Sequence, residues 1–303
     1  MVSMRFSKGY DRKPELLPAR PGTATSPRSR TSFLLLVSFL LFTCVFPAWA
    51  SDEKDPWKVL DEGLGVAEFS SSSSDELEYR ITVVRIDPRY YAFKLINASE
   101  NTREKMTARE WSRQFNLIAA VNAGMYQEDG LASVGYMKNF DHVNNPRLGR
   151  DKTVLAFNPS GPDVPEVQII DRECQDFNSL RQKYRTFVQS IRMISCDRKN
   201  VWRQQAGRWS TVAIGTDETG KVLLLFCRSP ITVHDFIEVL LTLPLSLQRA
   251  MYLEGGPQAS LYLSTGKTTL ERYGSWEPAL EQNSSIQIPL PVPNVIGIVK
   301  KTP

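Results

Sequence analysis

The sequence predicts a single α+β domain of mixed, mostly antiparallel β-sheets with a few packed helices, preceded by an export signal. Short runs rich in β-branched and aromatic residues recur through the chain, and turn sequences separate several of them, as in antiparallel hairpins. Strong helix signals occur in two places. The chain has 303 residues, of which 42% are hydrophobic and 23% charged, an ordinary globular composition.

Residues 1–50 predict the signal. Met1–Arg30 is rich in Arg, Pro and Ser, an apolar run from Phe33 to Val45 follows, and Ala48-Trp49-Ala50 has the A-x-A form of a cleavage site. The apolar run is shorter than the roughly 20 residues of a membrane span. We therefore expect cleavage near Ser51 and a secreted or periplasmic protein. An uncleaved anchor is the alternative, and it would be the protein's one membrane contact.

Export would place the remaining cysteines in an oxidising compartment. Cys174, Cys196 and Cys227 follow the signal, so one disulfide plus one free thiol is the simplest outcome, with Cys174–Cys196 as the first pairing to test. With two histidines and no C-x-x-C sequence, we expect no cofactor and no metal centre, although the residues leave a divalent metal open. The net charge of +4 includes the basic leader, so the exported part is nearly neutral, which argues against nucleic acid as a partner.

The part of the chain from Ser51 to the end has no evident linker, so 51–303 predicts one domain. Tyr79–Ile86 and Tyr90–Ile96 are expected to be strands, with a turn at Asp87-Pro88-Arg89 between them. The serine run Ser70–Ser74 lies between strand-like flanks and predicts a hairpin loop.

Two helix–strand units share one arrangement. The first is a helix over 107–115, opened by a capping-box sequence, followed by the strand 117–121, which ends on Asn122. The second is a helix over 232–241 followed by a strand that ends on Glu254. Polar side chains at strand ends are typical of ligand sites. The alternative is a coincidence of packing.

The region between the two units is mostly strands. They are predicted at Thr153–Phe157, Val167–Ile170, Phe187–Ile194, Ser210–Gly215 and Lys221–Cys227, with Asp217–Gly220 as a hairpin loop between the last two.

Two polar residues, Gln189 and Arg192, interrupt the apolar run Phe187–Ile194. A buried arginine needs a partner, and its planar guanidinium matches phosphate or carboxylate. Arg192 therefore predicts either an anion-binding residue or a salt bridge to an acid of the core.

The stretch from Met251 to Leu263 organises the second unit. An apolar run ends on Glu254, and Gly255 and Gly256 follow, where the backbone N–H groups can approach a ligand closely. Pro257 stops the strand, and Ala259–Leu263 predicts another. A carboxylate beside bare backbone donors suits a sugar or phosphate site. A tight turn with a solvated acid is the alternative.

Four ordered motifs resemble the phosphodiester glycosidase family: VNAGMY (121–126), VQSIRMI (188–194), STVAIG (210–215) and YLEGGPQAS (252–260). The resemblance extends from about Trp57 to Val299. It departs from the family at two places. The family motif LDGGGSS is replaced here by a sequence with Glu254, Pro257 and Gln258, and an Arg–Thr pair that is common before AIG is absent.

The resemblance implies hydrolysis of a sugar-1-phosphodiester, or a related envelope glycan linkage, through an oxocarbenium-like transition state. Glu254 is the expected carboxylate, which would stabilise that charge or activate water. Arg192 and the backbone donors would hold the phosphate, and Asn122 would bond sugar hydroxyls. These three side chains are expected to converge in one pocket. The predicted catalytic residues are therefore Glu254, Arg192 and Asn122, and the predicted substrate-binding residues are Gly124, Tyr126, Gln189, Gly215, Gly255, Gly256 and Ser260.

The predicted partner is thus a glycan or a sugar phosphodiester. The alternative function is a non-catalytic glycan-binding or polysaccharide-export accessory protein, which the altered glycine motif favours.

Overall fold

The structure is a computed structural model that describes residues 55–72, 78–275 and 289–302. One compact unit spans Glu53–Pro303. The predicted signal at 1–50 lies outside the described residues. Within them, no helix has the length and apolar character needed to cross a membrane.

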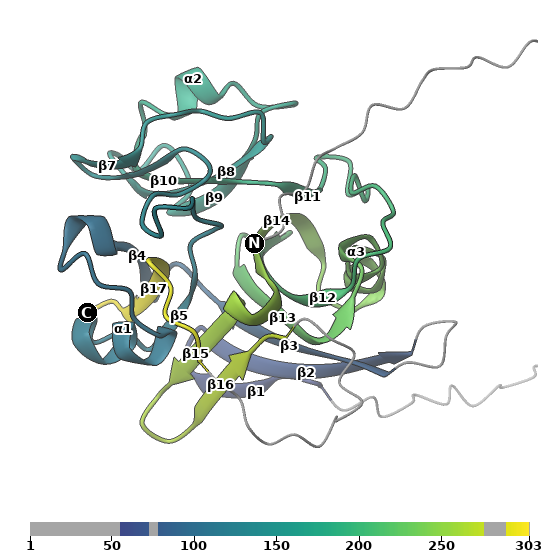
Figure 1. Ribbon diagram of the computed structural model, residues 1–303. Helices are drawn as coiled ribbons and strands as arrows, with labels where there is room; N and C mark the ends of the chain where they lie inside the picture. The colour runs from purple at the N-terminus through teal and green to yellow at the C-terminus, as the bar shows by residue number, and fades with distance from the viewer. Residues whose placement is uncertain (1–54, 73–77, 276–288, 303) are drawn as a thin grey trace, which may run out of the picture. The chain divides into compact units, whose positions relative to one another are not determined.

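The described residues form three β-sheets, and every strand pair in them is antiparallel, which confirms the predicted fold class (Figure 1). The seven-stranded sheet has the order β1 (Lys58–Asp61), β2 (Leu64–Ser72), β3 (Glu78–Ile86), β13 (Val222–Ile231), β12 (Trp209–Asp217), β14 (Leu247–Gly255) and β11 (Arg192–Ile194).

The other two sheets have five strands each. The β10 sheet has the order β7 (His142–Asn145), β6 (Met137–Asn139), β10 (Tyr184–Ser190), β8 (Thr153–Pro159) and β9 (Val167–Asp171). The β5 sheet has the order β16 (Thr269–Tyr273), β15 (Ser260–Ser264), β5 (Ala119–Asn122), β17 (Asn294–Lys300) and β4 (Tyr91–Asn97).

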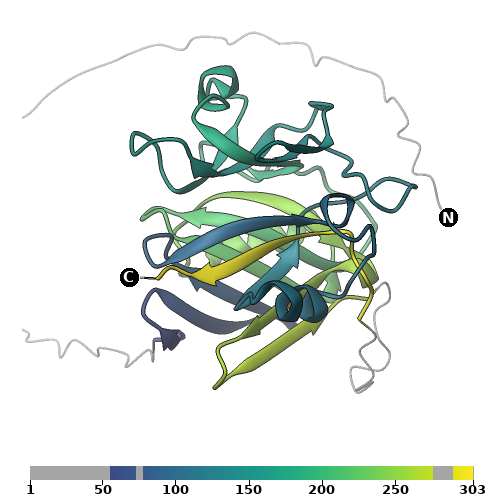
Figure 2. The same cartoon turned by 90° about the vertical axis from the view of Figure 1, so that its left-hand side faces the viewer.

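One hydrophobic core joins the three sheets. It includes Leu224 and Met251 of the seven-stranded sheet, Leu155 of the β10 sheet, and Val121 and Leu261 of the β5 sheet, all fully buried. In Figure 2 the β10 sheet forms a layer of its own above the strands of the other two. Burial of each large aliphatic side chain stabilises the fold by roughly 1.5–3 kcal/mol, so the sheets hold one another in place.

In the part of the chain that the structure describes, three α-helices pack on the sheets: α1 (Ala108–Phe115), α2 (Phe177–Leu180) and α3 (Val233–Thr242). Trp111 of α1 packs in a cluster with strands of the β5 sheet, and Phe236 of α3 packs against the seven-stranded sheet. Both long helices begin as predicted. Thr107 and Glu110 form a complete capping box, and the Thr232 side chain accepts from the backbone of Asp235.

The predicted strand Phe187–Ile194 is wrong as a single element. The structure divides it at Ile191 into β10 and β11, which belong to different sheets. The backbone N–H of Tyr252 donates to the carbonyl of Ile191, which ties the crossing to β14. Periodicity could not reveal this break because both halves are buried and extended.

A second crossing follows β14, whose apolar part the sequence predicted as Met251–Leu253. The chain passes through the short 3₁₀ helix η2 (Gly256–Gln258) into β15 of the β5 sheet. The predicted hairpin loop Ser70–Ser74 is partly wrong, because Ser70–Ser72 belong to β2 and pair with β3, while residues 73–77 lie outside the described part of the chain. The second hairpin is as predicted: β12 pairs with β13 around a turn in which the Asp217 carboxylate accepts three hydrogen bonds.

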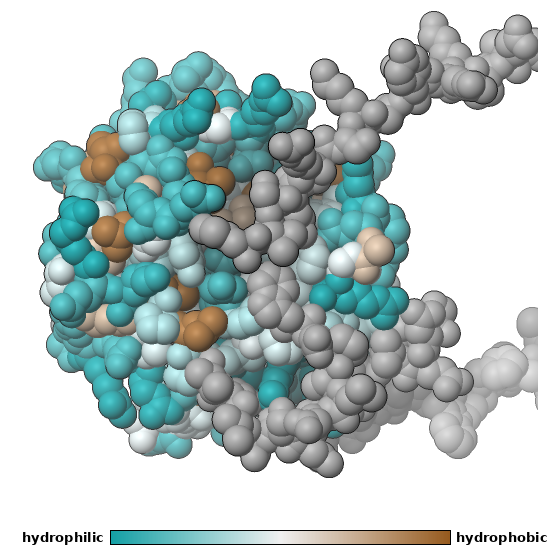
Figure 3. All heavy atoms as spheres, viewed as in Figure 1, coloured by the Kyte–Doolittle hydropathy of each residue, from teal (hydrophilic) through white to brown (hydrophobic). Residues whose placement is uncertain are grey.

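On the uncovered part of the face in Figure 3, hydrophobic residues appear as small separate patches among hydrophilic ones. Isolated apolar side chains of this kind are normal on protein surfaces.

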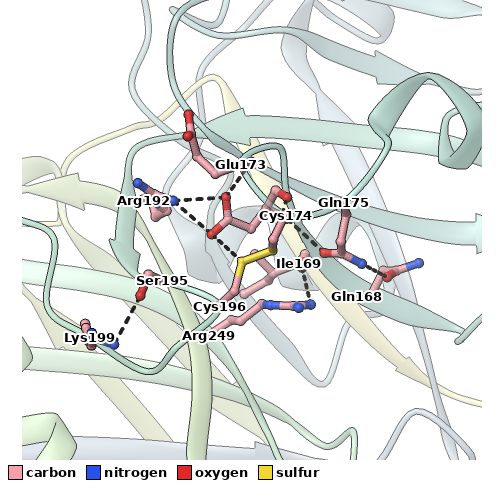
Figure 4. The surroundings of a disulfide bond; sticks show 11 residues. Gln168, Ile169, Glu173, Cys174, Gln175, Arg192, Ser195, Cys196, Lys199 and Arg249 are labelled. Atoms are coloured by element: carbon pink, nitrogen blue, oxygen red, sulfur yellow. Dashed lines mark hydrogen bonds and ion pairs between the residues drawn. A yellow bond between two sulfur atoms is a disulfide. The ribbon is translucent and has the colours of Figure 1, made fainter.

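The disulfide pairing is confirmed. Cys174 and Cys196 are bonded beside the salt bridge of Arg192 (Figure 4), and Cys227 is a free, buried thiol. The closed loop links the end of β9 to the segment after β11, so the bond ties the β10 sheet to the seven-stranded sheet.

Thiol counting tests this arrangement in protein that starts at Ser51. Burial raises the pKa of the Cys227 thiol to about 12, so the native protein is expected to react slowly with thiol reagents. Unfolding without reductant should expose one thiol, and unfolding with reductant three. Three thiols without reductant would contradict the disulfide.

Candidate functional site

Glu254 lies near the end of β14, where the chain is about to leave the seven-stranded sheet. The side chain is partly buried, and its Oε1 accepts a hydrogen bond from the backbone N–H of Gly255 at 3.0 Å. Burial raises the pKa of this carboxyl from 4.5 to about 7, although the hydrogen bond from Gly255 opposes the shift. Glu254 is therefore no solvated turn acid, because it exchanges its proton near neutral pH, where a general acid or base is most useful.

Two tyrosines from separate segments lie within the electrostatic reach of Glu254. The pKa of Tyr126 is raised, first by burial and then by the charge of Glu254, while a hydrogen bond with Gln258 lowers it. The pKa of Tyr252 is raised by burial and, again, by Glu254. The segment that carries Tyr126 therefore meets the glycine motif, as the sequence predicted.

Asn122 holds the segment of Tyr126 firmly against the glycine motif. Its side chain is 1% exposed; Nδ2 donates to the carbonyl of Gln258 at 3.0 Å, and Oδ1 accepts from the backbone N–H of Ser260 at 2.8 Å. The Ser260 hydroxyl donates to the same oxygen at 3.1 Å. Asn122 and Ser260 were predicted to touch substrate. The structure instead uses both to hold the crossing from β14 to β15.

The predicted glycines have different reasons for lacking a side chain. Gly256 has φ 64° and Gly124 has φ 106°, conformations that favour glycine. A Cβ on Gly255 would overlap the Tyr252 hydroxyl and the Trp209 ring, so aromatic groups cover this residue.

The prediction that Gly215 binds substrate is wrong. It lies inside β12, where a Cβ would overlap Leu247 and the carbonyl of Arg249 on β14. This glycine allows close packing within the sheet and has no place in a ligand site.

The prediction that Gln189 binds substrate is also wrong. It is 2% exposed, and its amide makes four hydrogen bonds to backbone: Oε1 accepts from Tyr136 and Gly149, and Nε2 donates to Gly149 and Asp151. The amide group has two donors and an oxygen with two lone pairs, so its capacity is filled. Gln189 fixes the loop before β8 and has nothing left for a sugar.

Of the two roles predicted for Arg192, the structure shows the salt bridge to an acid of the core. Its Nη1 lies 3.2 and 3.1 Å from the two carboxylate oxygens of Asp171, which is fully buried (Figure 4). Among the described residues no contact joins Arg192 to Glu254. The guanidinium neutralises a buried charge, and removing it would leave that carboxylate unpaired. The predicted convergence therefore holds for the Asn122 and Glu254 segments but not for Arg192.

Three aromatic residues that gather around Gly255 were missed. The rings of Trp202 and Tyr252 lie 5.4 Å apart between centroids, and the Trp209 ring lies against Gly255. Aromatic rings are suited to the apolar faces of sugars. The sequence carried no signal for their position, since Trp202 lies outside helices and strands and Trp209 precedes the predicted strand.

A cluster of potential metal ligands lies elsewhere, next to the disulfide. Among the described residues, Asp171, Cys174 and Cys196 bring potential ligand atoms within 4.8 Å of one another, but the two sulfurs are joined in the disulfide. The chemistry available at Glu254 is that of a protonatable carboxyl within the electrostatic reach of two tyrosines.

A family model described as phosphodiester glycosidase matches residues 115–299. No curated protein matches the sequence. Among solved structures, the pro-peptide-inhibited catalytic domain of zebrafish N-acetylglucosamine-1-phosphodiester alpha-N-acetylglucosaminidase aligns with a TM-score of 0.58 at 9% identity, over 82% of this chain and 85% of that one. A hypothetical protein from Synechocystis aligns with a TM-score of 0.55 at 15% identity, over 82% of this chain and 64% of that one. At these identities the two structures show a shared fold.

Replacing Asn122 by alanine tests its role at the crossing. The change leaves the backbone N–H of Ser260 and the carbonyl of Gln258 without partners, so we expect the free energy of unfolding in urea to fall by about 1–3 kcal/mol. Asn178→Ala, an exposed change on α2, is the matched control and should be nearly neutral. Equal stability of the two variants would contradict the role.

Glu254→Gln tests the raised pKa through stability. The folded state keeps its proton up to about pH 7, whereas the unfolded chain releases it from about 4.5. The stability that this carboxyl contributes is therefore present below pH 4.5 and is lost as the pH rises to about 7, by roughly 3 kcal/mol in all. Between pH 4.5 and 7, the free energy of unfolding of Glu254→Gln should rise relative to that of wild type by this amount. A constant difference between the two proteins would rule out the shift.

Proposed function

The chain belongs to the phosphodiester glycosidase family, and from this we propose that it is an exported hydrolase that cleaves a sugar-1-phosphodiester with Glu254 as its catalytic carboxyl. The observation that carries the proposal is the pKa of about 7 at a partly buried carboxyl between Tyr126 and Tyr252. Such a group is half ionised near neutral pH, so it can accept a proton there and release it again.

The leaving group decides which role suits Glu254. A phosphate monoester departs as a stable anion, so protonation of the leaving oxygen adds little, in contrast to an ordinary glycoside. The slow part is attack on the ring carbon as positive charge develops. Glu254 in its ionised form removes a proton from the attacking water, and its negative charge stabilises the oxocarbenium-like transition state.

The surroundings support a sugar beside this carboxyl. Tyr126, whose pKa responds to the charge of Glu254, offers a ring face for the apolar side of a sugar. Because the guanidinium of Arg192 is bound to Asp171, another cation must face the phosphate. Lys105 is exposed, and its Nζ lies 5.8 Å from the centroid of the Tyr126 ring. We assign the phosphate to this side of the site.

The substrate class follows from the family and the fold. The zebrafish structure is, by its printed name, an enzyme for N-acetylglucosamine-1-phosphodiesters. We propose the same linkage class for this chain, on glycans outside the cytoplasm, because residues 1–50 predict a secretory signal.

A non-catalytic glycan-binding protein is the second candidate. It is favoured by the departure at the glycine motif, where Pro257 and Gln258 stand in a sequence that is richer in glycine and serine in the family. The carbonyl of Gln258 is bonded to Asn122, so this version of the loop is built into the fold.

Purified protein that starts at Ser51 should release free sugar from a panel of 1-phosphodiesters of N-acetylglucosamine, glucose, galactose and mannose. The logarithm of kcat/KM should rise with pH up to about 7 and then level off, because the ionised form of Glu254 acts as base. Glu254→Gln should lower kcat by about a hundredfold or more and abolish the rise.

Glu218→Gln is the control for that series, because Glu218 is exposed in the turn between β12 and β13. It should keep wild-type rates. Full activity in folded Glu254→Gln would remove the proposed catalyst. Sugar binding without release of product from any member of the panel would favour the second candidate.

A further inference from the structure

A row of positive charge lies along strand β6 of the β10 sheet, apart from the site described above. Just before this strand, the guanidinium of Arg181 lies over the rings of Tyr136 and Phe177, 5.9 and 6.0 Å from their centroids. Just after the strand, the guanidinium of Arg185 lies 4.6 Å from the centroid of the Phe140 ring. Both arginines are exposed.

Lys138 is the third cation of the row, between the two aromatic contacts. It lies opposite Phe187 in the pairing of β6 with β10, and Phe187 packs against Phe177 of α2. Side chains opposite each other in a pair share a face, so Lys138 is on the face that carries α2. Figures 1 and 2 show α2 on the side of the β10 sheet that is turned away from the other two sheets. Because Tyr136 and Phe140 are four residues apart, the row spans at most about 13 Å.

The protein's own carboxylates do not neutralise this row. Within the described residues, none of its three cations forms an ion pair. Lys183, which lies between the two arginines in the sequence, is instead bound to Asp163 at 2.5 Å, and the Asp176 carboxylate accepts from the start of α2. The hairpin 137–145 has one acid, the exposed Asp141. Three cations are therefore left against a single carboxylate.

The chemistry of the row favours a ligand with several anionic groups. A guanidinium that stacks on a ring is held in place and still presents its N–H edge, which matches the oxygens of a phosphate. Because the side chain is already ordered, less conformational entropy is lost on binding. Cations spread along the whole of β6 cannot all reach one phosphate group, so a polyanion suits the row better.

The apolar surface beside the row favours sugars as the other part of that ligand. Phe140 is 38% exposed, and Val143, which lies opposite Lys138 on β7, is 45% exposed. Apolar side chains of this kind suit the faces of sugar rings. Two such side chains are too few to insert into a lipid bilayer, which takes the whole apolar face of an amphipathic helix.

We propose that Arg181, Lys138 and Arg185 form a docking surface for an anionic polysaccharide whose sugars are joined through phosphodiesters. The polymer would then be the form in which the substrate reaches Glu254. This rests on the proposed function for its substrate class. The surface lies on the far side of the β10 sheet from the core that this sheet shares with β14, so binding to it is measured separately from turnover.

The test measures binding to a polysaccharide of N-acetylglucosamine units joined through 1-phosphodiesters. Titration calorimetry uses Glu254→Gln protein as the parent, so that the polymer is not consumed, and neutral dextran of the same length is the uncharged probe. Changing Arg181, Lys138 and Arg185 together to glutamine should raise Kd for the charged polymer by about ten- to a hundredfold, since exposed ion pairs are weak singly and add along a row. Added NaCl should weaken binding by the parent.

The control is a triple variant with the same loss of charge elsewhere. Lys94→Gln on β4, Arg113→Gln on α1 and Lys267→Gln in the turn between β15 and β16 all change exposed residues. This variant should bind the polymer as the parent does.

A double variant, Arg181→Gln with Arg185→Gln, repeats the test without changing the half-buried Lys138. Both of its changes are at exposed positions, so its melting temperature should match that of the parent. Replacing the same two arginines by lysine keeps the charge and should keep most of the affinity.

Turnover separates this inference from the proposed function. With Glu254 in place, the glutamine triple variant should cleave a monomeric sugar-1-phosphodiester at the wild-type rate and lose kcat/KM only on the polymer. No cleavage of either substrate by wild type would count against the proposed function, and the binding measurements would still decide on the docking surface.

The same titrations with phosphatidylglycerol vesicles and with single-stranded DNA test other polyanions. Three results would overturn the inference: a parent that binds dextran as tightly as the charged polymer, equal affinity of the two triple variants for that polymer, or tighter binding to the vesicles or to DNA than to the polymer.

Discussion

The amide of Asn122 is the interaction on which the site depends. At this point the chain leaves the seven-stranded sheet after Glu254 and enters the β5 sheet at Ser260. One buried side chain bonds both the end of η2 and the start of β15, so the loop has one path between the sheets. The position of Glu254 relative to Tyr126 follows from this, because Tyr126 comes four residues after Asn122 on the same segment.

A fixed loop explains why a carboxyl is tolerated in partly buried surroundings. Burial raises the pKa of Glu254, which lowers stability at neutral pH, and the surrounding core supplies the stability that offsets this cost. The fully buried Thr211 hydroxyl, which has no hydrogen-bond partner, adds a similar cost on the neighbouring strand β12. Groups that oppose folding thus lie on two adjacent strands, β12 and β14, and perturbed groups of this kind are common at functional sites.

Gln189 and Arg192 were expected in the site but lie elsewhere, and their polar groups are paired within the protein. The Gln189 amide is saturated by backbone, and Arg192 neutralises the buried Asp171 next to the disulfide. Gln189 holds loops of the β10 sheet, and Arg192 of β11 ties the seven-stranded sheet to Asp171 of β9 in the β10 sheet. A polar residue in an apolar run signals a specific partner, and here that partner is the protein itself.

Local physics in the sequence was enough for most of the strands between Tyr79 and Leu263, for both helix caps, for the β12–β13 hairpin and for the Glu254 motif, because each depends on neighbours along the chain. It also placed Asn122 and Glu254 at the ends of two strands. The break at Ile191, the partners of Gln189 and Arg192, and the aromatic groups around Gly255 were decided only by the tertiary structure. Each of these depends on which sheet a strand joins, and that choice is made by burial against residues far away in the sequence.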